Sequence, residues 1–385
     1  MKKFLRKTTA EDFVLTINPK YIPAWGKWEA LREIMQNVID RKREYEAAEI
    51  IFDYNANRQR VTIGNKMSYL EKKTMILGET TKADNAQLVG QYGEGYKLAL
   101  LVFLRMGTRV RIRNGSEIWA PSIKFSEQFG TELLTITVLP AAHTDNLIFE
   151  LDGITLDDYK QFKNNCLEVD PPTEKITTSL GDILLEEKFR SRLFVEGLFI
   201  CKFSDAEKIR YGYNMRAGKI ELDRDRKKVG TFNLLWQLGT MYGELDSTYA
   251  NFVYQLRAEK WLDVDYYESM SANKTKPLYQ ALASMHYADF IATYGQNVIP
   301  VQNEEEAKLV REKYNHLRPI ITERIKYEYI TASNAYKSSD TSKLPVEETP
   351  YSIIKKIIKK KVKDKELCEE LLEELLPLAR KWQKR

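Results

Sequence analysis

Apolar and polar positions along the first 155 residues predict a long amphipathic helix among several strands. Apolar residues recur at helical spacing over residues 27–48, so one face of that helix is apolar. A continuous apolar segment at 96–107 predicts a buried helix that ends at Gly107. Alternating and β-branched segments predict the strands, namely EIIFDYN, RVTI, TRVRIRNG, SEIWAPSIKF, TELLTITVLP and NLIFEL. The pattern is typical of an α+β sandwich with helices on one face of a mixed sheet.

The remainder of the chain divides by composition into four further segments. Residues 156–235 predict a second α/β domain, and 236–335 a mostly helical region with many Tyr and Leu residues. Within that region, 288–322 predicts helix, strand, helix and strand, a small α/β unit. Residues 336–350 form a polar linker with prolines, and 351–385 an amphipathic helical tail, basic in its first half and acidic in its second.

Composition indicates an ordinary globular protein of the cytoplasm. The 385 residues are 43% apolar and 30% charged, enough for two or three domains with their own cores. The longest apolar run, 98–104, is too short to cross a bilayer, and the first residues do not form a signal peptide. Three widely spaced cysteines, Cys166, Cys201 and Cys368, suit a reducing compartment and suggest no zinc site.

The net charge does not identify a binding partner. A net charge of +5 permits nucleic-acid contact without arguing for it. The charged tail predicts docking to a protein partner or self-association, with a membrane-surface anchor or a nucleic-acid contact as alternatives. The acidic half of the tail argues against a pure membrane anchor.

Two groups of residues carry candidate chemistry. Glu33, Asn37 and Asp40 are spaced i, i+4 and i+7, so they share the helix face opposite the apolar one. The run Gly90–Tyr96 offers backbone N–H groups that no β-carbon shields, next to a helix start. Oxygen-bearing side chains and exposed N–H groups are what a metal-bound triphosphate requires.

Both groups resemble motifs of the GHKL ATPases, which include DNA gyrase B, the 90-kDa heat-shock chaperones, MutL and the histidine kinases. EIMQNVID at 33–40 is similar to the helical Glu-x-x-x-Asn-x-x-Asp motif, and GQYGEGY at 90–96 to the Gly-x-x-Gly-x-Gly lid hinge, closest to the chaperone and MutL-like versions. The resemblance implies ATP and Mg²⁺ as ligands. It implies Glu33 as the catalytic base, Asn37 as the Mg²⁺ ligand and Asp40 as support for the pocket. Nucleotide contacts are implied for Gln91, Tyr92, Gly93, Glu94, Gly95 and Tyr96.

Three further positions resemble the family less closely. Asn65 stands where the family has an adenine-reading Asp, without the glycines that follow it; an amide oxygen can still accept that bond, although the alternative is a plain turn. Lys82, in LGETTK, resembles a lid lysine that approaches the phosphates, or is a solvated loop charge. Thr131, after Gly130, resembles the threonine that touches adenine, or is an ordinary strand residue.

The second domain also has a counterpart in the chaperones. RLFVEGLFI at 192–200 resembles a strand of their middle domain, and LDRDR at 222–226 resembles the segment that brings an arginine onto the γ-phosphate. The matching residue is Arg226, which the resemblance implies as a second catalytic group. The alternative is a solvated charge run.

Other nucleotide-binding classes do not fit. There is no P-loop sequence, and Leu98 stands where a Rossmann motif needs its third glycine. All three histidines, His143, His286 and His316, follow the Asn37 helix, which argues against histidine-kinase activity. We therefore expect a GHKL ATPase, similar to compact bacterial or phage members, whose nucleotide state controls domain closure or partner binding. The alternative is a nucleotide sensor, or a vestigial pocket in a protein that binds DNA or a defence or repair protein.

Overall fold

The computed structural model describes residues 10–76, 95–220 and 231–343, together with a few positions of the tail. The chain is α+β and divides into two compact units, residues 1–244 with 260–266 and residues 245–259 with 267–385. The predicted segments 1–155 and 156–235 both fall in the first unit. No helix in these described ranges is long and apolar enough to cross a membrane.

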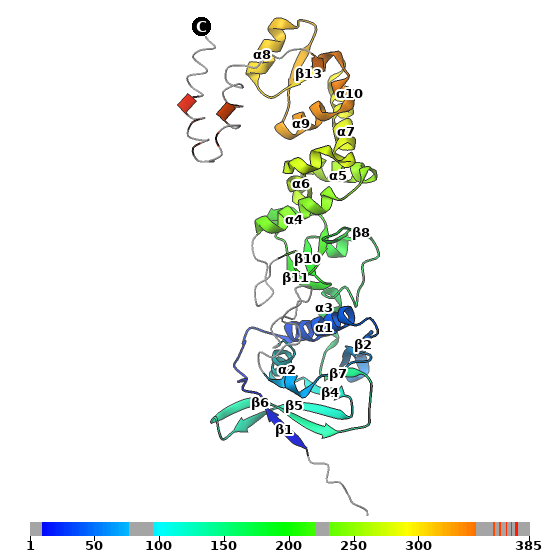
Figure 1. Cartoon of the computed structure of the whole chain (residues 1–385), viewed down its shortest axis with the longest axis vertical. Coiled ribbons are helices and arrows are strands. Elements are labelled where there is room, and N and C mark those ends of the chain that lie inside the picture. The colour runs from blue at the N-terminus through cyan, green and yellow to red at the C-terminus, as the bar shows by residue number, and fades with distance from the viewer. Residues whose placement is uncertain are drawn as a thin grey trace, which may run out of the picture. The chain divides into compact units, whose positions relative to one another are not determined.

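The first unit contains a seven-stranded sheet (Figure 1). Its order is β1-β6-β5-β4-β7-β3-β2, and every pairing in it is antiparallel, so the prediction of a mixed sheet was wrong. Strand β7 lies between β4 and β3, although it is the last of the seven in sequence. The strands are β1 (Glu11–Val14), β2 (Ile50–Asn55), β3 (Arg60–Asn65), β4 (Arg109–Asn114), β5 (Glu117–Ser126), β6 (Thr131–Pro140) and β7 (Leu147–Asp152).

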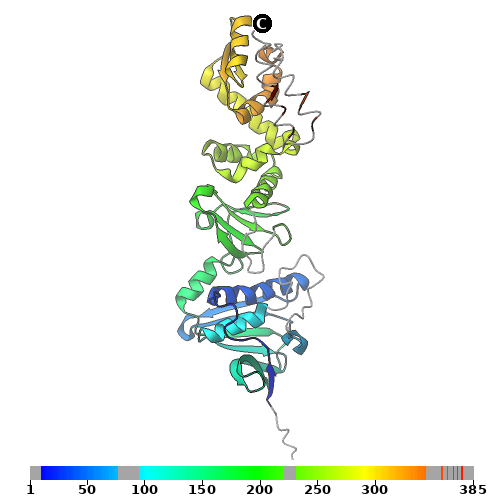
Figure 2. The same ribbon diagram turned by 90° about the vertical axis from the view of Figure 1, so that its left-hand side faces the viewer.

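Helices α1 (Lys27–Glu44), α2 (Gly95–Arg105) and α3 (Leu156–Asn164) cover one face of this sheet (Figure 2). The apolar residues expected on α1 are all in the core, where they meet inward-facing strand residues. Each fully buried Leu, Ile or Phe stabilises the fold by about 1.5–3 kcal/mol. Helix α2 ends where predicted, because Gly107 has φ +77°, a conformation that favours glycine. The core includes Leu31, Ile34, Met35, Leu101, Phe103, Ile112, Trp119, Ile136 and Phe149.

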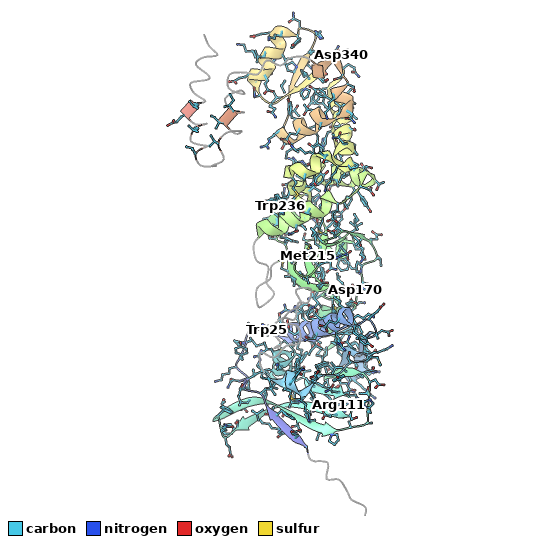
Figure 3. All side chains as sticks on the ribbon, viewed as in Figure 1. Trp25, Arg111, Asp170, Met215, Trp236 and Asp340 are labelled. Atoms are coloured by element: carbon cyan, nitrogen blue, oxygen red, sulfur yellow. The ribbon has the colours of Figure 1, made fainter. Side chains whose placement is uncertain are left out.

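The loop before α1 is held by a single arginine at the end of α2. The guanidinium of Arg105 donates to four backbone carbonyls of that loop, those of Pro19, Tyr21, Ile22 and Trp25, at 2.9–3.2 Å. Trp25 lies beside the first turn of α1 (Figure 3). Because α1 begins directly after this loop, Arg105 fixes the entry of the chain into the helix that carries the predicted site.

A second, five-stranded sheet completes the first unit. Its order is β11-β10-β12-β9-β8; β10 and β12 are parallel and the other pairs are antiparallel. Met215 ends β12 in this sheet (Figure 3). The strands are β8 (Lys175–Thr177), β9 (Gly181–Leu184), β10 (Arg192–Val195), β11 (Leu198–Lys202) and β12 (Gly212–Met215), and helix α4 (Thr231–Gly243) follows them.

The second unit is mostly helical. Its order α7-β13-α8-β14 is the helix, strand, helix and strand predicted for 288–322, and β13 and β14 pair in parallel. His286 of α7 is buried and lies against the rings of Tyr254 and Tyr329, with centroid distances of 4.8 and 4.7 Å. The elements are α5 (Ala250–Ala258), α6 (Asp265–Ser269, which begins in the first unit), α7 (Pro277–Tyr294), β13 (Val298–Val301), α8 (Glu304–Lys313), β14 (Arg318–Ile321), α9 (Arg324–Ala332) and α10 (Asn334–Lys337).

Candidate functional site

Helix α1 presents the three predicted polar side chains in unequal environments. Asp40 is fully buried and accepts a hydrogen bond from Gln36 Nε2 at 2.9 Å. Glu33 is 6% exposed, and Asn37 is the most accessible of the three. The Nδ2 of Asn37 donates to the Glu33 carbonyl at 2.9 Å, so its Oδ1 is the atom left to face a ligand. An amide oxygen in that position suits a hard cation such as Mg²⁺.

The end of the glycine motif lies against Glu33. Gly95 is the first residue of α2, and a β-carbon built on it would stand 2.5 Å from Glu33 Oε2. No side chain fits there unless the carboxylate moves. The structure thus places Glu33 of the first motif next to Gly95, the last glycine of the second motif and the first residue of a helix.

The residues after Gly95 tie α2 to the short 3₁₀ helix η2 (Lys72–Met75). Tyr96 donates its hydroxyl proton to the Thr74 carbonyl at 2.8 Å, and burial raises the pKa of this phenol to about 12, so it stays a donor. Lys97 is fully buried and donates to the Ile76 carbonyl. Sequence reasoning took Tyr96 as a nucleotide contact and missed Lys97. A single lysine inside an otherwise apolar helix was the available signal.

A second buried cation, Arg32, lies beside the predicted base. One of its terminal nitrogens is 3.4 Å from Glu33 Oε1, and its guanidinium lies 5.8 Å from the ring centroid of Trp25. Arg32 is only 5% exposed, so water screens this ion pair weakly. Sequence reasoning missed Arg32 as well, because a basic residue next to Glu33 is expected to lie on the exposed surface of the helix. The arrangement holds one carboxylate oxygen against Arg32 while the other faces Gly95.

Asn65 ends β3 and is bound to the polypeptide backbone. Its Nδ2 donates to the carbonyls of Val38 and Ala48, both at 3.0 Å, and the residue is 1% exposed. Because both neighbours are acceptors, the NH₂ group must face them, and Oδ1 faces the other way. Asn65 is thus not a plain turn residue. It joins β3 to α1 and can act toward a ligand only as an acceptor.

Thr131 does not lie with the other predicted residues. It begins β6, which is four strands away from β3 in the sheet, and it sits at the opposite end of its strand from the end that lies level with Asn65. Its hydroxyl accepts a hydrogen bond from Asn18 Nδ2 at 2.9 Å. The assignment of Thr131 to the adenine site is therefore corrected: the strand beside β3 is β7, where Leu147 is paired with Asn65.

Several predicted residues lie outside the described part of the chain. These are Arg226 and, in the segment before Gly95, Lys82, Gln91, Tyr92, Gly93 and Glu94.

Within the described ranges, no group of three or more His, Cys, Asp or Glu side chains could hold a metal by itself. A Mg²⁺ ion bound through a nucleotide needs only one or two protein ligands, since phosphate oxygens and water supply the rest. The amide oxygen of Asn37, whose side chain is half-buried, fits that requirement.

No protein-family model matches the sequence, and no curated protein matches it. One solved structure found to be similar is that of the ATPase and transducer domains of DNA topoisomerase II from Balamuthia mandrillaris, with 14% identity and a TM-score of 0.23. The match covers 33% of this chain and 37% of that one, so the chain spans well under half of the structure it matches. At this TM-score the two do not share a demonstrated fold, and the case for a function rests on the chain's own geometry.

Proposed function

We propose that this chain binds Mg²⁺-ATP and hydrolyses the γ-phosphate, in the manner of the GHKL ATPases. One observation carries the proposal: the Glu33 carboxylate lies in the space that a side chain on Gly95 would need. A general base next to a glycine at a helix N-terminus is the pairing that water attack on a bound triphosphate requires.

The described residues take distinct roles in this proposal. Asn37 Oδ1 would hold Mg²⁺, which neutralises phosphate charge when bound. Glu33 would orient the attacking water and take its proton, while Arg32 holds the other carboxylate oxygen in place. Asp40 supports the helix from inside, and Asn65 Oδ1 would accept a hydrogen bond from the adenine amino group. Arg226 is proposed as the residue of the second domain that meets the γ-phosphate, which would couple hydrolysis to domain closure or partner binding.

Two measurements on the purified protein test the proposal. Calorimetry with ATP and Mg²⁺ should show binding, and release of inorganic phosphate should continue over many turnovers. Binding without turnover would favour the alternative of a nucleotide sensor, and absence of binding would reject both. A Glu33→Ala sample prepared in parallel guards against a contaminating ATPase.

A further inference from the structure

The turn between β10 and β11 has an unfavourable residue at its first position. Val195 pairs with Leu198, so the turn consists of Glu196 and Gly197, whose φ angles are +54° and +82°. Two positive φ angles are the signature of a type I′ turn, which favours Asn, Asp or Gly at the first position. A glutamate with its β-carbon is costly there, so its side chain is expected to have another role.

The carboxylate of Glu196 has two partners from distant parts of the first unit. One oxygen pairs with the guanidinium of Arg43, and the other accepts the backbone N–H of Ala217. Arg43 belongs to the last turn of α1, one turn beyond Asp40. Ala217 is the second residue after β12. A single carboxylate therefore joins the helix of the candidate site to the segment that leaves the second sheet.

The turn does not need this carboxylate to form. The Glu196 N–H donates to the Met215 carbonyl at 2.9 Å, and the Gly197 N–H donates to Asn214 Oδ1 at 2.8 Å. The Gly197 carbonyl in turn accepts the Leu167 N–H at 2.7 Å. These bonds hold the hairpin whatever side chain stands at position 196, so the carboxylate can be removed without removing the hairpin.

We propose that Glu196 is a positioning residue of the second sheet, which couples α1 to the segment after β12 and so makes turnover depend on that sheet. The proposal rests on the proposed ATPase function. A helix moves as a rigid body, so a shift of α1 when Asn37 and Glu33 engage a nucleotide moves Arg43 as well. The charge-assisted bonds of Glu196 pass that shift to Ala217.

Glu196→Asn separates coupling from folding. Asn-Gly is a favoured type I′ pair, so this variant should melt at the wild-type temperature or above it. The shorter side chain cannot span both partners, and kcat should fall about 5- to 50-fold, a usual range for coupling between sites, while the Kd for ADP changes less than about twofold. Arg43→Gln should cause a similar loss of kcat, and the double variant should be no worse than either single one.

The matched control is Asp182→Asn. It removes an ion pair with Lys175 in the same sheet, and the Asp182 side chain is 15% exposed against 13% for Glu196. The control should keep wild-type kcat. Wild-type kcat in Glu196→Asn or Arg43→Gln, or additive losses in the double variant, would overturn the coupling role.

A readout without turnover distinguishes failure of the coupling from failure of the ATPase proposal. Hydrogen exchange of the Ala217 amide is measured without nucleotide in the wild type and in Arg43→Gln. Faster exchange in the variant supports the link, because Arg43 itself does not touch that amide; unchanged exchange overturns it. Calorimetry that shows no nucleotide binding would reject the proposed function by a separate measurement.

Discussion

The carboxylate of Glu33 occupies the space that a β-carbon on Gly95 would need, with Oε2 only 2.5 Å from that position. The two residues belong to different helices and to different sequence motifs. The conflict would be with the movable end of a side chain and not with the backbone. A methyl group at position 95 should therefore displace the proposed base without unfolding the domain.

Gly95→Ala tests this relationship directly. We expect turnover to fall at least about tenfold, since a base must lie within hydrogen-bond reach of its proton, while the unfolding free energy changes by less than about 1 kcal/mol. Phosphate release and urea unfolding measure the two effects. Gly64→Ala is the contrasting variant: its β-carbon would stand 1.9 Å from the Leu147 carbonyl oxygen, so the fold itself should be lost. Wild-type turnover in Gly95→Ala would show that Glu33 is not the catalytic base.

Glu33→Ala should keep ATP binding and lower turnover by about 10²–10⁴-fold, the usual contribution of a positioned base. Single-turnover kinetics at saturating ATP isolates this step from binding. A variant that hydrolyses ATP at the wild-type rate would place the base elsewhere.

Asn37→Ala should abolish Mg²⁺-dependent binding of ATP, because it removes the amide oxygen proposed as the metal ligand. Titration calorimetry with and without Mg²⁺ measures the effect. The lost bond from Nδ2 to the Glu33 carbonyl lies within a helix, so circular dichroism should show an intact fold. Equal affinities in the two proteins would contradict a metal role for Asn37.

Asn65 should favour ATP over GTP. A free Asn amide can offer either a donor or an acceptor to a base, which would make the selectivity weak. The structure removes that basis, because both amide protons are used by the Val38 and Ala48 carbonyls. An acceptor suits the adenine amino group and repels the guanine oxygen, and we expect about tenfold or greater preference for ATP in competition binding. Equal competition by GTP would show that Oδ1 does not face the base.

Asn65→Asp should then destabilise the fold. A carboxylate cannot donate to the two carbonyls, and each buried unsatisfied group costs about 1–3 kcal/mol. Urea unfolding should report the loss.

His286 should make the stability of the second unit depend on pH. Burial is the main reason that its pKa is lowered from 6.5 to about 4, and neither ring nitrogen has a hydrogen-bond partner. The unfolded chain binds the proton first as pH falls, so stability is complete above pH 6.5 and is lost progressively toward pH 4, by up to about 3 kcal/mol. His286→Phe keeps the stacked ring, and should raise stability and flatten this dependence. Hydrogen exchange of α7 amides between pH 4 and 8 measures it; the same slope in both proteins would contradict the assignment.

Local spacing was sufficient to predict the parts of the site that come from single helices. The face of α1 that carries Glu33 and Asn37 follows from helical geometry, and the freedom of Gly95 follows from its lack of a side chain. The prediction that Thr131 lies at the adenine site failed because it depended on which strands are neighbours. Strand order is set by pairing between distant segments. The residue pattern predicted the strands, but it did not predict their order in the sheet or that every pair is antiparallel.

The contacts that position the site were also beyond local reasoning. The pattern of apolar and polar residues does not predict that Arg105 binds the carbonyls of the loop before α1. It also does not predict that Arg43 pairs with Glu196. Such pairs depend on where folded elements meet.

The interior position of β7, between β4 and β3, has a consequence for the nascent chain. On the ribosome, β2–β3 and β4–β5–β6 can each form as hairpins while β7, which joins them, is still unmade. Until residue 152 emerges, two sheet fragments expose open inner edges, and the sheet beneath α1 and α2 is incomplete. A nascent chain that stalls before this point would be prone to aggregate and would need chaperones, and the candidate site would be complete only after the last strand inserts.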